Sequence, residues 1–189
     1  MELMEAIQNR RSVRKFSDYY VTDEEIKEII DAARRAPSWA NTQVWEFIVV
    51  REQELVKRVT ETYSESNPAR QCSMAASVII VACAKTDISG CRDGKDRTKF
   101  HEWFMFDLGL AVQNLCLKVH ELGLGTVIVG SINHEACGKL LLLPGGHEVI
   151  VALPIGKPAD TGEKRIPPRK ELKTFVHLNK FGEHYGKIY

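Results

Sequence analysis

The chain has 189 residues, of which 44% are hydrophobic and 27% are charged, and its formal net charge at pH 7 is +1. This length predicts one domain, residues 1–189, with enough chain for a real core, and the small net charge excludes a global field that draws nucleic acid or acidic lipid. No apolar run is long enough to span a membrane, and the first residues lack the basic and apolar regions of a signal peptide. We therefore expect a cytoplasmic protein that binds neither nucleic acid nor membranes.

A basic segment, Arg10-Arg11-Ser12-Val13-Arg14-Lys15, follows a short predicted helix at the N-terminus. Guanidinium groups match the oxygens of a phosphate, and the Ser12 hydroxyl adds a donor. One interpretation is therefore a phosphate site, and the other is a solvated basic turn.

An uncharged segment follows the next predicted helix. Thr22 and Glu25 form a capping box that starts this helix, and Pro37 ends it. Residues 38–43 then carry amides, hydroxyls and the indole of Trp39. Such a segment can hydrogen-bond the edge of a neutral heterocycle, although a plain polar connection fits the same residues.

Four apolar runs predict buried strands, and amphipathic segments between them predict helices, which indicates an α/β or α+β domain. The strands are expected at residues 44–50, 77–84, 126–129 and 149–155. Between the second strand and the following helix, residues 85–99 are charged and aperiodic, so we expect a surface loop that serves as a lid.

The most informative stretch is Thr98–Gly125, which predicts a long helix running into a short strand. Its apolar side chains form two stripes on opposite sides, whereas an ordinary surface helix has one. One stripe fits the core of the domain. The other fits either a further layer of the same domain or a second copy of the chain.

The last part of the chain is polar and rich in proline. It carries a second basic group, Lys164, Arg165, Arg169 and Lys170, and a tail, residues 171–189, with several large apolar side chains. A tail of this kind usually wraps something, such as a partner subunit.

Most catalytic signatures are absent. There is no glycine-rich nucleotide cradle and no nucleophile turn, and the histidines lack the spacing of metal ligands. The five cysteines form no C-x-x-C pair, so we expect reduced, mostly buried thiols and no metal site.

Asp107 and Glu102 are interpreted as structural partners, and no catalytic residue is assigned. The two basic groups and the uncharged segment together suggest a ligand with an anionic end and a flat, uncharged end.

Four segments, taken in order, resemble the FMN-dependent nitroreductase family across nearly the whole chain: Arg10–Arg14, Pro37–Trp45, Gly123–Thr126 with Gly130, and Pro168–Leu172. The resemblance implies an α+β fold with a central mixed sheet of about four to five strands flanked by helices. It also implies an intertwined homodimer with FMN at the interface, in which the second stripe of the long helix and the tail pack against the partner.

The resemblance implies the following site. The FMN phosphate and ribityl chain are held by Arg10, Arg11, Ser12 and Arg14, joined by Arg169 and assisted by Lys170. The flavin ring is lined by Pro37, Ser38, Trp39, Asn41 and Gln43, in part from the other protomer. The backbone that faces the flavin comes from Ile128, Val129, Gly130 and Ser131. A further polar and basic pair near the ring is Asn67 and Arg70.

Three residues depart from the family pattern. Val44 stands where proline is frequent, Trp39 stands where small residues are common and narrows the ring pocket, and Gly130 stands where one subgroup carries Glu. The last departure leaves only a backbone contact, the Gly130 N–H, to face flavin N5.

The implied reaction is a ping-pong transfer of hydride from NADH or NADPH to FMN and then to an electron-poor small molecule, such as a nitroaromatic or a quinone, with the hard chemistry supplied by the cofactor. Three alternatives stay open: a flavin carrier or sensor without turnover, a specialised family reaction such as dehalogenation or flavin fragmentation, and a protein without flavin that binds another phosphorylated metabolite or a nucleic acid.

Overall fold

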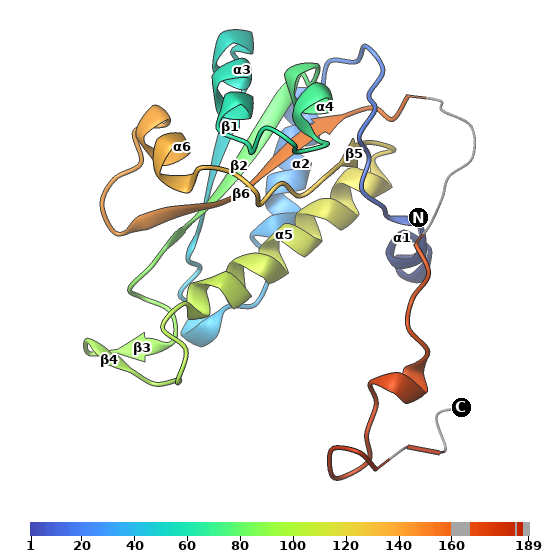
Figure 1. Cartoon of the computed structure of the whole chain (residues 1–189), viewed down its shortest axis with the longest axis vertical. Helices are drawn as coiled ribbons and strands as arrows, with labels where there is room; N and C mark the ends of the chain where they lie inside the picture. The colour runs from blue at the N-terminus through green and yellow to red at the C-terminus, as the bar shows by residue number, and fades with distance from the viewer. Residues whose placement is uncertain (160–166, 184, 187–189) are drawn as a thin grey trace.

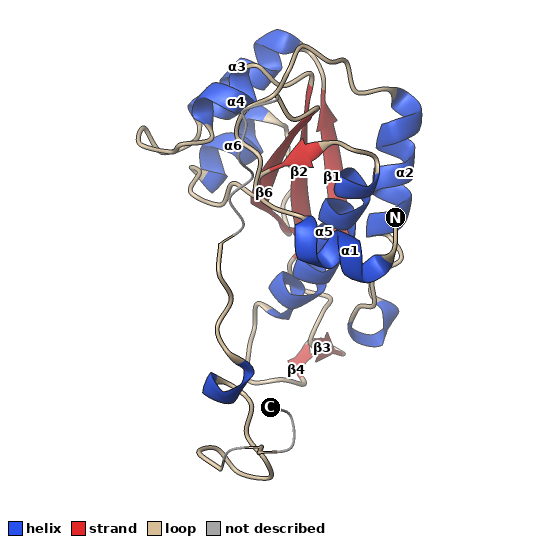
Figure 2. Ribbon diagram, turned by 90° about the vertical axis from the view of Figure 1, so that its right-hand side faces the viewer, coloured by secondary structure: helices blue, strands red, loops and turns tan. Residues whose placement is uncertain are grey.

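The computed structural model describes residues 1–159, 167–183 and 185–186. Its centre is a four-stranded sheet in the order β1-β2-β6-β5. The strands are β1 (Trp45–Val50), β2 (Val78–Lys85), β5 (Gly125–Thr126) and β6 (His147–Gly156). Helices cover both faces of this sheet, which makes three layers (Figure 1; Figure 2).

The central strand β2 shows why two layers of helices are needed. Its residues Val78 to Ala84 are all buried, so the run is continuously apolar, as expected for a strand covered on both faces. Successive side chains of a strand point to opposite faces. Ile80 and Ala82 accordingly belong to the core on one side of the sheet, and Ile79 and Val81 belong to the core on the other.

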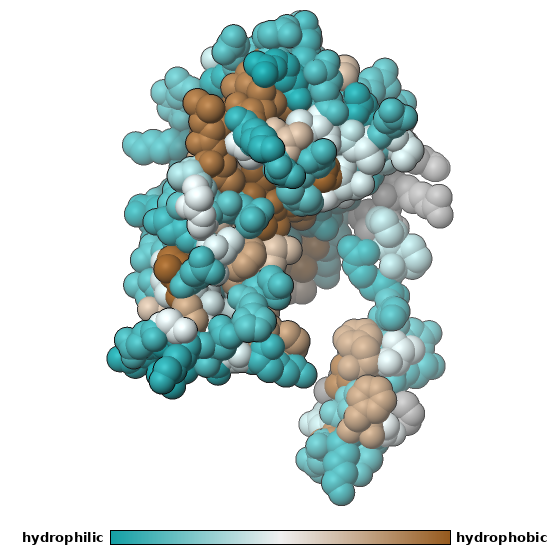
Figure 3. All heavy atoms as spheres, turned by 60° about the vertical axis from the view of Figure 1, so that its left-hand side comes forward, coloured by the Kyte–Doolittle hydropathy of each residue, from teal (hydrophilic) through white to brown (hydrophobic). Residues whose placement is uncertain are grey.

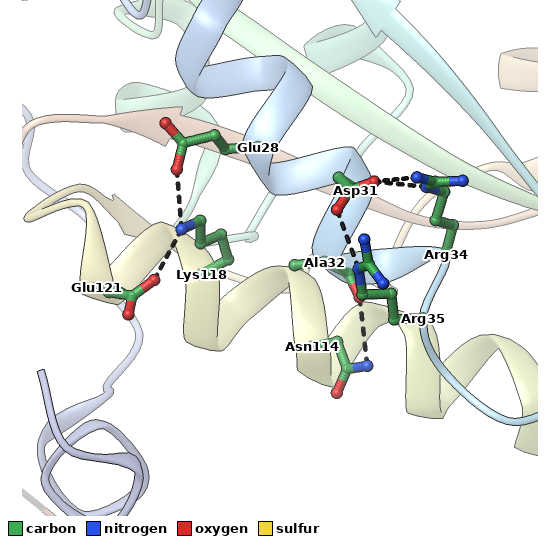
Figure 4. Close-up of polar contacts among 8 residues, drawn as sticks. All are labelled: Glu28, Asp31, Ala32, Arg34, Arg35, Asn114, Lys118 and Glu121. Carbon is green, nitrogen blue, oxygen red and sulfur yellow. Dashed lines mark hydrogen bonds and ion pairs between the residues drawn. The ribbon is translucent and has the colours of Figure 1, made fainter.

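One face is covered by α2 (Asp23–Ala33) and α5 (Trp103–Glu121), which pack on each other. The predicted capping box at the start of α2 is confirmed, since the Glu25 backbone N–H donates to Thr22 Oγ1 at 3.2 Å and the Thr22 N–H donates to Glu25 Oε2 at 2.8 Å. Polar contacts tie the two helices together (Figure 4): Lys118 Nζ lies 2.8 Å from carboxylate oxygens of both Glu28 and Glu121. The contact with Glu28 joins α5 to α2, whereas Glu121 lies on α5 itself.

The other face is covered by α3 (Gln53–Glu61), α4 (Arg70–Met74) and α6 (His134–Leu140). The Asn133 side chain caps α6 by accepting the Ala136 backbone N–H at 2.9 Å, as its position before the helix predicts. A short helix, α1 (Leu3–Asn9), starts the chain and lies near α5 (Figure 2).

Several boundaries differ from the sequence prediction. The predicted strand at residues 126–129 is wrong in extent, because β5 ends at Thr126 and the chain leaves the ladder. Val129 then makes only an isolated bridge with Ala152. Val127 and Val129 are buried while Ile128 is 46% exposed, so the alternating exposure of an edge segment replaces the fully buried strand that was expected. The sequence predicted a mixed sheet. The named strands pair antiparallel, and the parallel pairing is an isolated bridge between Ser12 and Thr126.

The segment 85–99 is not a plain loop. It contains a two-stranded hairpin of β3 (Cys91–Arg92) and β4 (Lys95–Asp96), which lies at the N-terminal end of α5 (Figure 1). The two turn residues, Asp93 and Gly94, have φ of 54° and 68°, the left-handed conformation that a two-residue hairpin turn requires.

The two stripes of α5 have different surroundings. In the first, Phe104, Leu108 and Leu115 are buried in the core, whereas in the second Phe106 is 60% exposed. The second stripe is only partly uncovered, because Leu110 packs against the core and Trp103 and Leu117 are half-buried. Gly123, with φ of 72°, follows the end of the helix in the left-handed conformation that glycine adopts without cost.

The tail extends away from the body of the molecule and contains one short turn, η2 (Leu172–Thr174) (Figure 1; Figure 3). Its apolar side chains are exposed, with Phe175 at 53% and Phe181 at 93%. None of the helices in the described ranges is long and apolar enough to cross a membrane.

Candidate functional site

The basic segment Arg10–Lys15 is held against the edge of the sheet. The Val13 N–H donates to the Thr126 carbonyl at 2.9 Å, and the Ala159 N–H donates to the Lys15 carbonyl at 3.0 Å. Ser12 adds a parallel bridge with Thr126. These backbone contacts fix the position of the segment at the sheet edge, while the side chains of Ser12, Arg14 and Lys15 are exposed.

Glycine at position 125 permits this close approach. A Cβ atom added at Gly125 meets the Cβ of Val13 at 2.7 Å, a separation that carbon atoms do not tolerate. Gly125, the first residue of β5, therefore allows the basic segment to pack directly against this strand.

Arg10 and Arg11 line a cavity of about 360 Å³ together with Glu5 and Thr126. Thr126 is 4% exposed, and its hydroxyl is buried without a hydrogen-bond partner in the described part of the chain. Buried hydroxyls normally have a partner, but this one is enclosed by the protein, so the charged groups that the cavity presents are the guanidinium groups of Arg10 and Arg11 and the carboxylate of Glu5. The two guanidinium groups fit a phosphate-bearing ligand, which makes the residues present suitable for the anionic end of FMN.

Charges of this segment act on two buried thiols. Burial raises the pKa of Cys116 to about 11, and the nearby Arg10 guanidinium opposes that rise. Burial likewise raises the pKa of Cys72, with Arg14 among the groups that oppose it. Arg10 thus lies near Cys116 of α5, and Arg14 lies near Cys72 of α4. All five cysteines are unpaired and four of them are buried, in agreement with the sequence prediction.

Residues 128–131 lie next in the chain after β5. The Val129 N–H donates to the Ala152 carbonyl at 2.9 Å, while Ile128 and Gly130 are exposed. Asn67 Nδ2 donates to the Ser131 carbonyl at 3.4 Å, so the predicted polar residue from the loop before α4 does reach this segment. The Arg70 guanidinium instead donates to the Tyr63 carbonyl at 2.8 Å.

The uncharged segment, residues 37–43, lies at the opposite end of α5. The Trp39 backbone N–H donates to both carboxylate oxygens of Asp107, at 3.2 and 3.1 Å, and Ser38 Oγ accepts the Gln43 N–H at 2.9 Å. Ala40, Asn41 and Gln43 all have positive φ, between 47° and 57°. The backbone of residues 37–43, called the Trp39 turn below, is therefore strained, and these hydrogen bonds hold it in place.

The two halves of the predicted site are therefore separate within one chain. The basic segment lies beside His120 at the C-terminal end of α5, and the Trp39 turn is anchored at Asp107 near its N-terminal end. With a rise of 1.5 Å per residue, these positions are about 20 Å apart along the helix axis. Within one chain, the Trp39 turn and the basic segment therefore do not contact the same ligand.

Arg169 and Lys170 directly precede the tail and are exposed. The Arg169 guanidinium donates to the Pro167 carbonyl at 3.2 Å, and no contact joins it to the basic segment in the described ranges. Lys164 and Arg165 lie outside the described residues. Within residues 1–159, 167–183 and 185–186, no group of three or more His, Cys, Asp or Glu side chains is placed to hold a metal ion.

Sequence reasoning missed one feature beside the Trp39 turn, a cavity under the β3–β4 hairpin lined in part by Arg92 and Arg97. The signal was present, since Asp-Gly between two short runs predicts a two-residue hairpin turn. The structural role expected for Asp107 is confirmed by its two hydrogen-bond partners, the Trp39 N–H and the Ser89 hydroxyl.

Comparison with known proteins agrees with this architecture. A relative from Archaeoglobus fulgidus, provisionally named NADH dehydrogenase/NAD(P)H nitroreductase, is 34% identical over 163 residues, which cover 84% of this chain and 87% of the relative. The FMN reductase (NAD(P)H) of Bacillus subtilis is 30% identical over 191 residues, covering 94% of this chain and 75% of the relative. The crystal structure of a nitroreductase family protein from Clostridium novyi NT superposes with a TM-score of 0.76 at 27% identity, covering 99% of this chain and 98% of that one.

The sequence profile of the Nitroreductase family matches residues 7–157. That range contains three of the four segments that carried the resemblance, namely Arg10–Arg14, Pro37–Trp45, and Gly123–Thr126 with Gly130. The expected nitroreductase-like α+β fold is confirmed by the superposition and by the three-layer arrangement. This chain belongs to the Nitroreductase family.

Proposed function

We propose that the protein binds FMN between two copies of the chain and uses it to transfer hydride from NADH or NADPH to small electron-poor acceptors such as nitroaromatics or quinones. Family membership supports flavin-dependent oxidoreduction. So do the names of relatives, which include an FMN reductase (NAD(P)H) and an NADPH-flavin oxidoreductase from Vibrio harveyi, the latter 29% identical over 185 residues. The observation that carries the proposal is the pair of guanidinium groups, Arg10 and Arg11, that line one cavity at the edge of the sheet.

The roles of the residues follow from their placement. Arg10 and Arg11, which line the cavity, are joined by Ser12 and Arg14 of the same segment, which lie outside its lining, in binding the phosphate and ribityl chain, because guanidinium groups and a hydroxyl hold an anion by charge-assisted hydrogen bonds. The exposed backbone of Gly130 and Ser131 faces the ring. Bound FMN supplies the hydride transfer in both directions, and positive charge near the ring stabilises the anionic reduced form. No side chain of this chain is assigned as a proton donor.

A homodimer is supported by surfaces that a single chain leaves exposed. On α5, Met105 is 48% and Phe106 is 60% exposed, and on the tail Phe175 and Phe181 are exposed as well. Figure 3 shows the apolar side chains of the tail standing clear of the body. In a dimer, the Trp39 turn of one copy lies against the basic segment of the other, and Arg169, just before the tail, approaches the same ligand.

The direct test is the visible spectrum of the purified protein, followed by identification of the released flavin. We expect an oxidised-flavin spectrum that bleaches on anaerobic mixing with NADH or NADPH and returns on addition of a quinone or nitroaromatic. Bleaching without return favours the carrier or sensor alternative. A protein that stays colourless after incubation with FMN contradicts the proposal.

The phosphate assignment has its own test. Arg10→Ala and Arg14→Ala each remove a charged hydrogen bond of about 1.5–3 kcal/mol, so we expect the Kd for FMN to rise roughly tenfold or more in either variant. Lys27→Ala, which removes an exposed cation of α2, is the matched control and leaves the Kd unchanged. Unaltered FMN affinity in both arginine variants contradicts the assignment.

A further inference from the structure

A second cavity lies between the Trp39 turn and the β3–β4 hairpin, outside the basic segment and the 128–131 segment. Its volume is about 700 Å³, and its lining includes Trp39, Ile88, Arg92, Asp93 and Arg97. It therefore combines an indole, an aliphatic side chain and two guanidinium groups opposed by one carboxylate.

Both walls of this cavity are anchored to the same buried carboxylate. Asp107, which is 1% exposed, accepts the Trp39 backbone N–H on one side and the Ser89 hydroxyl, at 2.6 Å, on the other. The Arg97 N–H donates to the Gly90 carbonyl at 2.7 Å, and Gly90 packs so closely on Trp103 that an added Cβ meets the Trp103 Cβ at 2.6 Å. The turn and the hairpin are thus fixed relative to α5, and the cavity is a built feature of the fold.

The two arginines of this cavity are not engaged elsewhere. Arg51, Arg34 and Arg35 each bind a carboxylate, and Arg70 binds a carbonyl. The guanidinium groups of Arg92 and Arg97, by contrast, make no hydrogen bond or ion pair within the described ranges. In this respect they resemble Arg10 and Arg11, whose guanidinium groups line the cavity assigned to the FMN phosphate.

We propose that this cavity is an anion-binding subsite, in which Trp39 contacts the flat part of a reactant and Arg92 and Arg97 hold its carboxylate or phosphate. The proposal rests on the proposed function, because Trp39 belongs to the turn assigned to the flavin ring. An aromatic anion matches the lining, since guanidinium groups bind such oxygens in bidentate fashion and an indole face packs on a ring. The anion belongs either to an acceptor, such as a nitrobenzoate, or to the phosphates of the nucleotide donor, NADPH above all.

The first experiment measures binding without turnover. The oxidised holoprotein is titrated in a calorimeter with benzoate, which it cannot reduce, and with benzamide, its neutral counterpart. We expect benzoate to bind at least about tenfold more tightly, as one charged hydrogen bond contributes about 1.5–3 kcal/mol. Arg92→Ala and Arg97→Ala should each reduce this preference roughly fivefold or more, and the double variant should abolish it.

The matched control is Lys95→Ala, which removes one positive charge from the same hairpin at a residue that does not line the cavity. We expect it to keep the preference for benzoate within about twofold, whereas a general field from the hairpin predicts the same loss in all three variants. Equal losses in all three, or a wild-type protein that does not distinguish benzoate from benzamide, overturn the proposal.

The second experiment identifies the source of the anion. For each variant, kcat/KM is compared for 4-nitrobenzoate and its methyl ester, and for NADPH and NADH. A loss confined to 4-nitrobenzoate identifies the acceptor, and a loss confined to NADPH identifies the donor. If neither nucleotide reduces the flavin while benzoate still binds in an arginine-dependent way, the proposed function fails and the subsite stands.

Discussion

Asp107 is a buried carboxylate with no cationic partner among the described residues, and it accepts hydrogen bonds from two different segments, since the Trp39 N–H donates to both of its oxygens and the Ser89 hydroxyl donates to Oδ2. It holds the backbone of Trp39, whose turn contains three residues with positive φ, and it holds Ser89 at the base of the hairpin. A carboxylate with four lone-pair sites is well suited to accept from both at once. Asp107 is therefore a positioning residue for the ring-facing turn and the hairpin together.

We expect Asp107→Ala to loosen this turn more than it destabilises the whole fold. The Trp39 N–H then loses its acceptor, which costs about 1–3 kcal/mol, while the desolvation cost of a buried charge is relieved. Hydrogen exchange of the Trp39 amide should accelerate roughly tenfold or more, with Ser89→Ala as the control that leaves this amide protected. Unchanged exchange at Trp39 contradicts the anchoring role.

Cys83 makes stability dependent on pH in the alkaline range. Burial raises its pKa from 9.0 to about 12, with smaller contributions from Cys137 and Glu46. The stabilising contribution of the protonated thiol is complete below pH 9 and is lost as pH rises towards 12, because the unfolded chain releases this proton first.

We expect the free energy of unfolding to fall by roughly 1.4 kcal/mol at pH 10 through this residue, one pKa unit above its value in the unfolded chain. Urea unfolding at pH 8 and pH 10 measures the change. Cys83→Ala removes this part of the pH dependence and lowers the free energy of unfolding at both pH 8 and pH 10. A wild-type midpoint that is the same at pH 8 and pH 10 contradicts the expectation.

At the scale of the elements, the basic segment and β5 behave as one unit. Gly125→Ala places a methyl group 2.7 Å from the Cβ of Val13, so the segment that carries Arg10 and Arg14 must move away from the sheet edge. We expect a loss of stability of about 1–3 kcal/mol from overpacking and weaker retention of FMN. Thermal unfolding and flavin titration measure the two effects.

The compensating variant separates this contact from other effects of the substitution. Val13→Gly combined with Gly125→Ala removes the three side-chain atoms that the added methyl group meets, so the double variant should recover both stability and FMN affinity relative to Gly125→Ala alone. A double variant as impaired as the single one indicates that the contact with Val13 is not the cause. Gly145→Ala, at a position with open space for a Cβ, is the neutral control.

The sequence predicted most elements because their signals are local. The capping box at Thr22, the Asn133 cap and the period of α5 each depend on residues within about two helical turns. The extent of β5 and the β3–β4 hairpin were not predicted correctly. An edge segment after Thr126 keeps its apolar residues even though it pairs at only one further point, Val129 with Ala152, and apolar content alone does not distinguish these cases.

At the scale of the whole molecule, a single chain leaves the two halves of the proposed site apart and two apolar surfaces exposed. Phe106→Glu places a charge on the exposed stripe of α5, and each dimer contains this change twice. Since burial of one such side chain contributes about 1.5–3 kcal/mol, we expect dissociation to become easier by roughly 3–6 kcal/mol per dimer. Sedimentation measures the oligomeric state, and flavin content should fall with it.

Leu142→Glu is the control for this prediction. Leu142 is 88% exposed on the connection between α6 and β6, so the same change in chemistry falls on a surface outside the proposed interface. We expect this variant to remain dimeric with a full complement of flavin. A Phe106→Glu protein that also remains a dimer and retains FMN contradicts the proposed interface.

The sequence by itself determined the order of the elements, the family and the residue types available to hold a phosphate and a flat ring, because caps, periodicity and short motifs act between near neighbours. Only the tertiary structure decided which of these groups meet. It placed the basic segment on Gly125 and Thr126, more than a hundred residues later in the chain, and placed the Trp39 turn at the far end of α5. Such pairings depend on how whole layers pack on the sheet, and no local pattern in the chain encodes them.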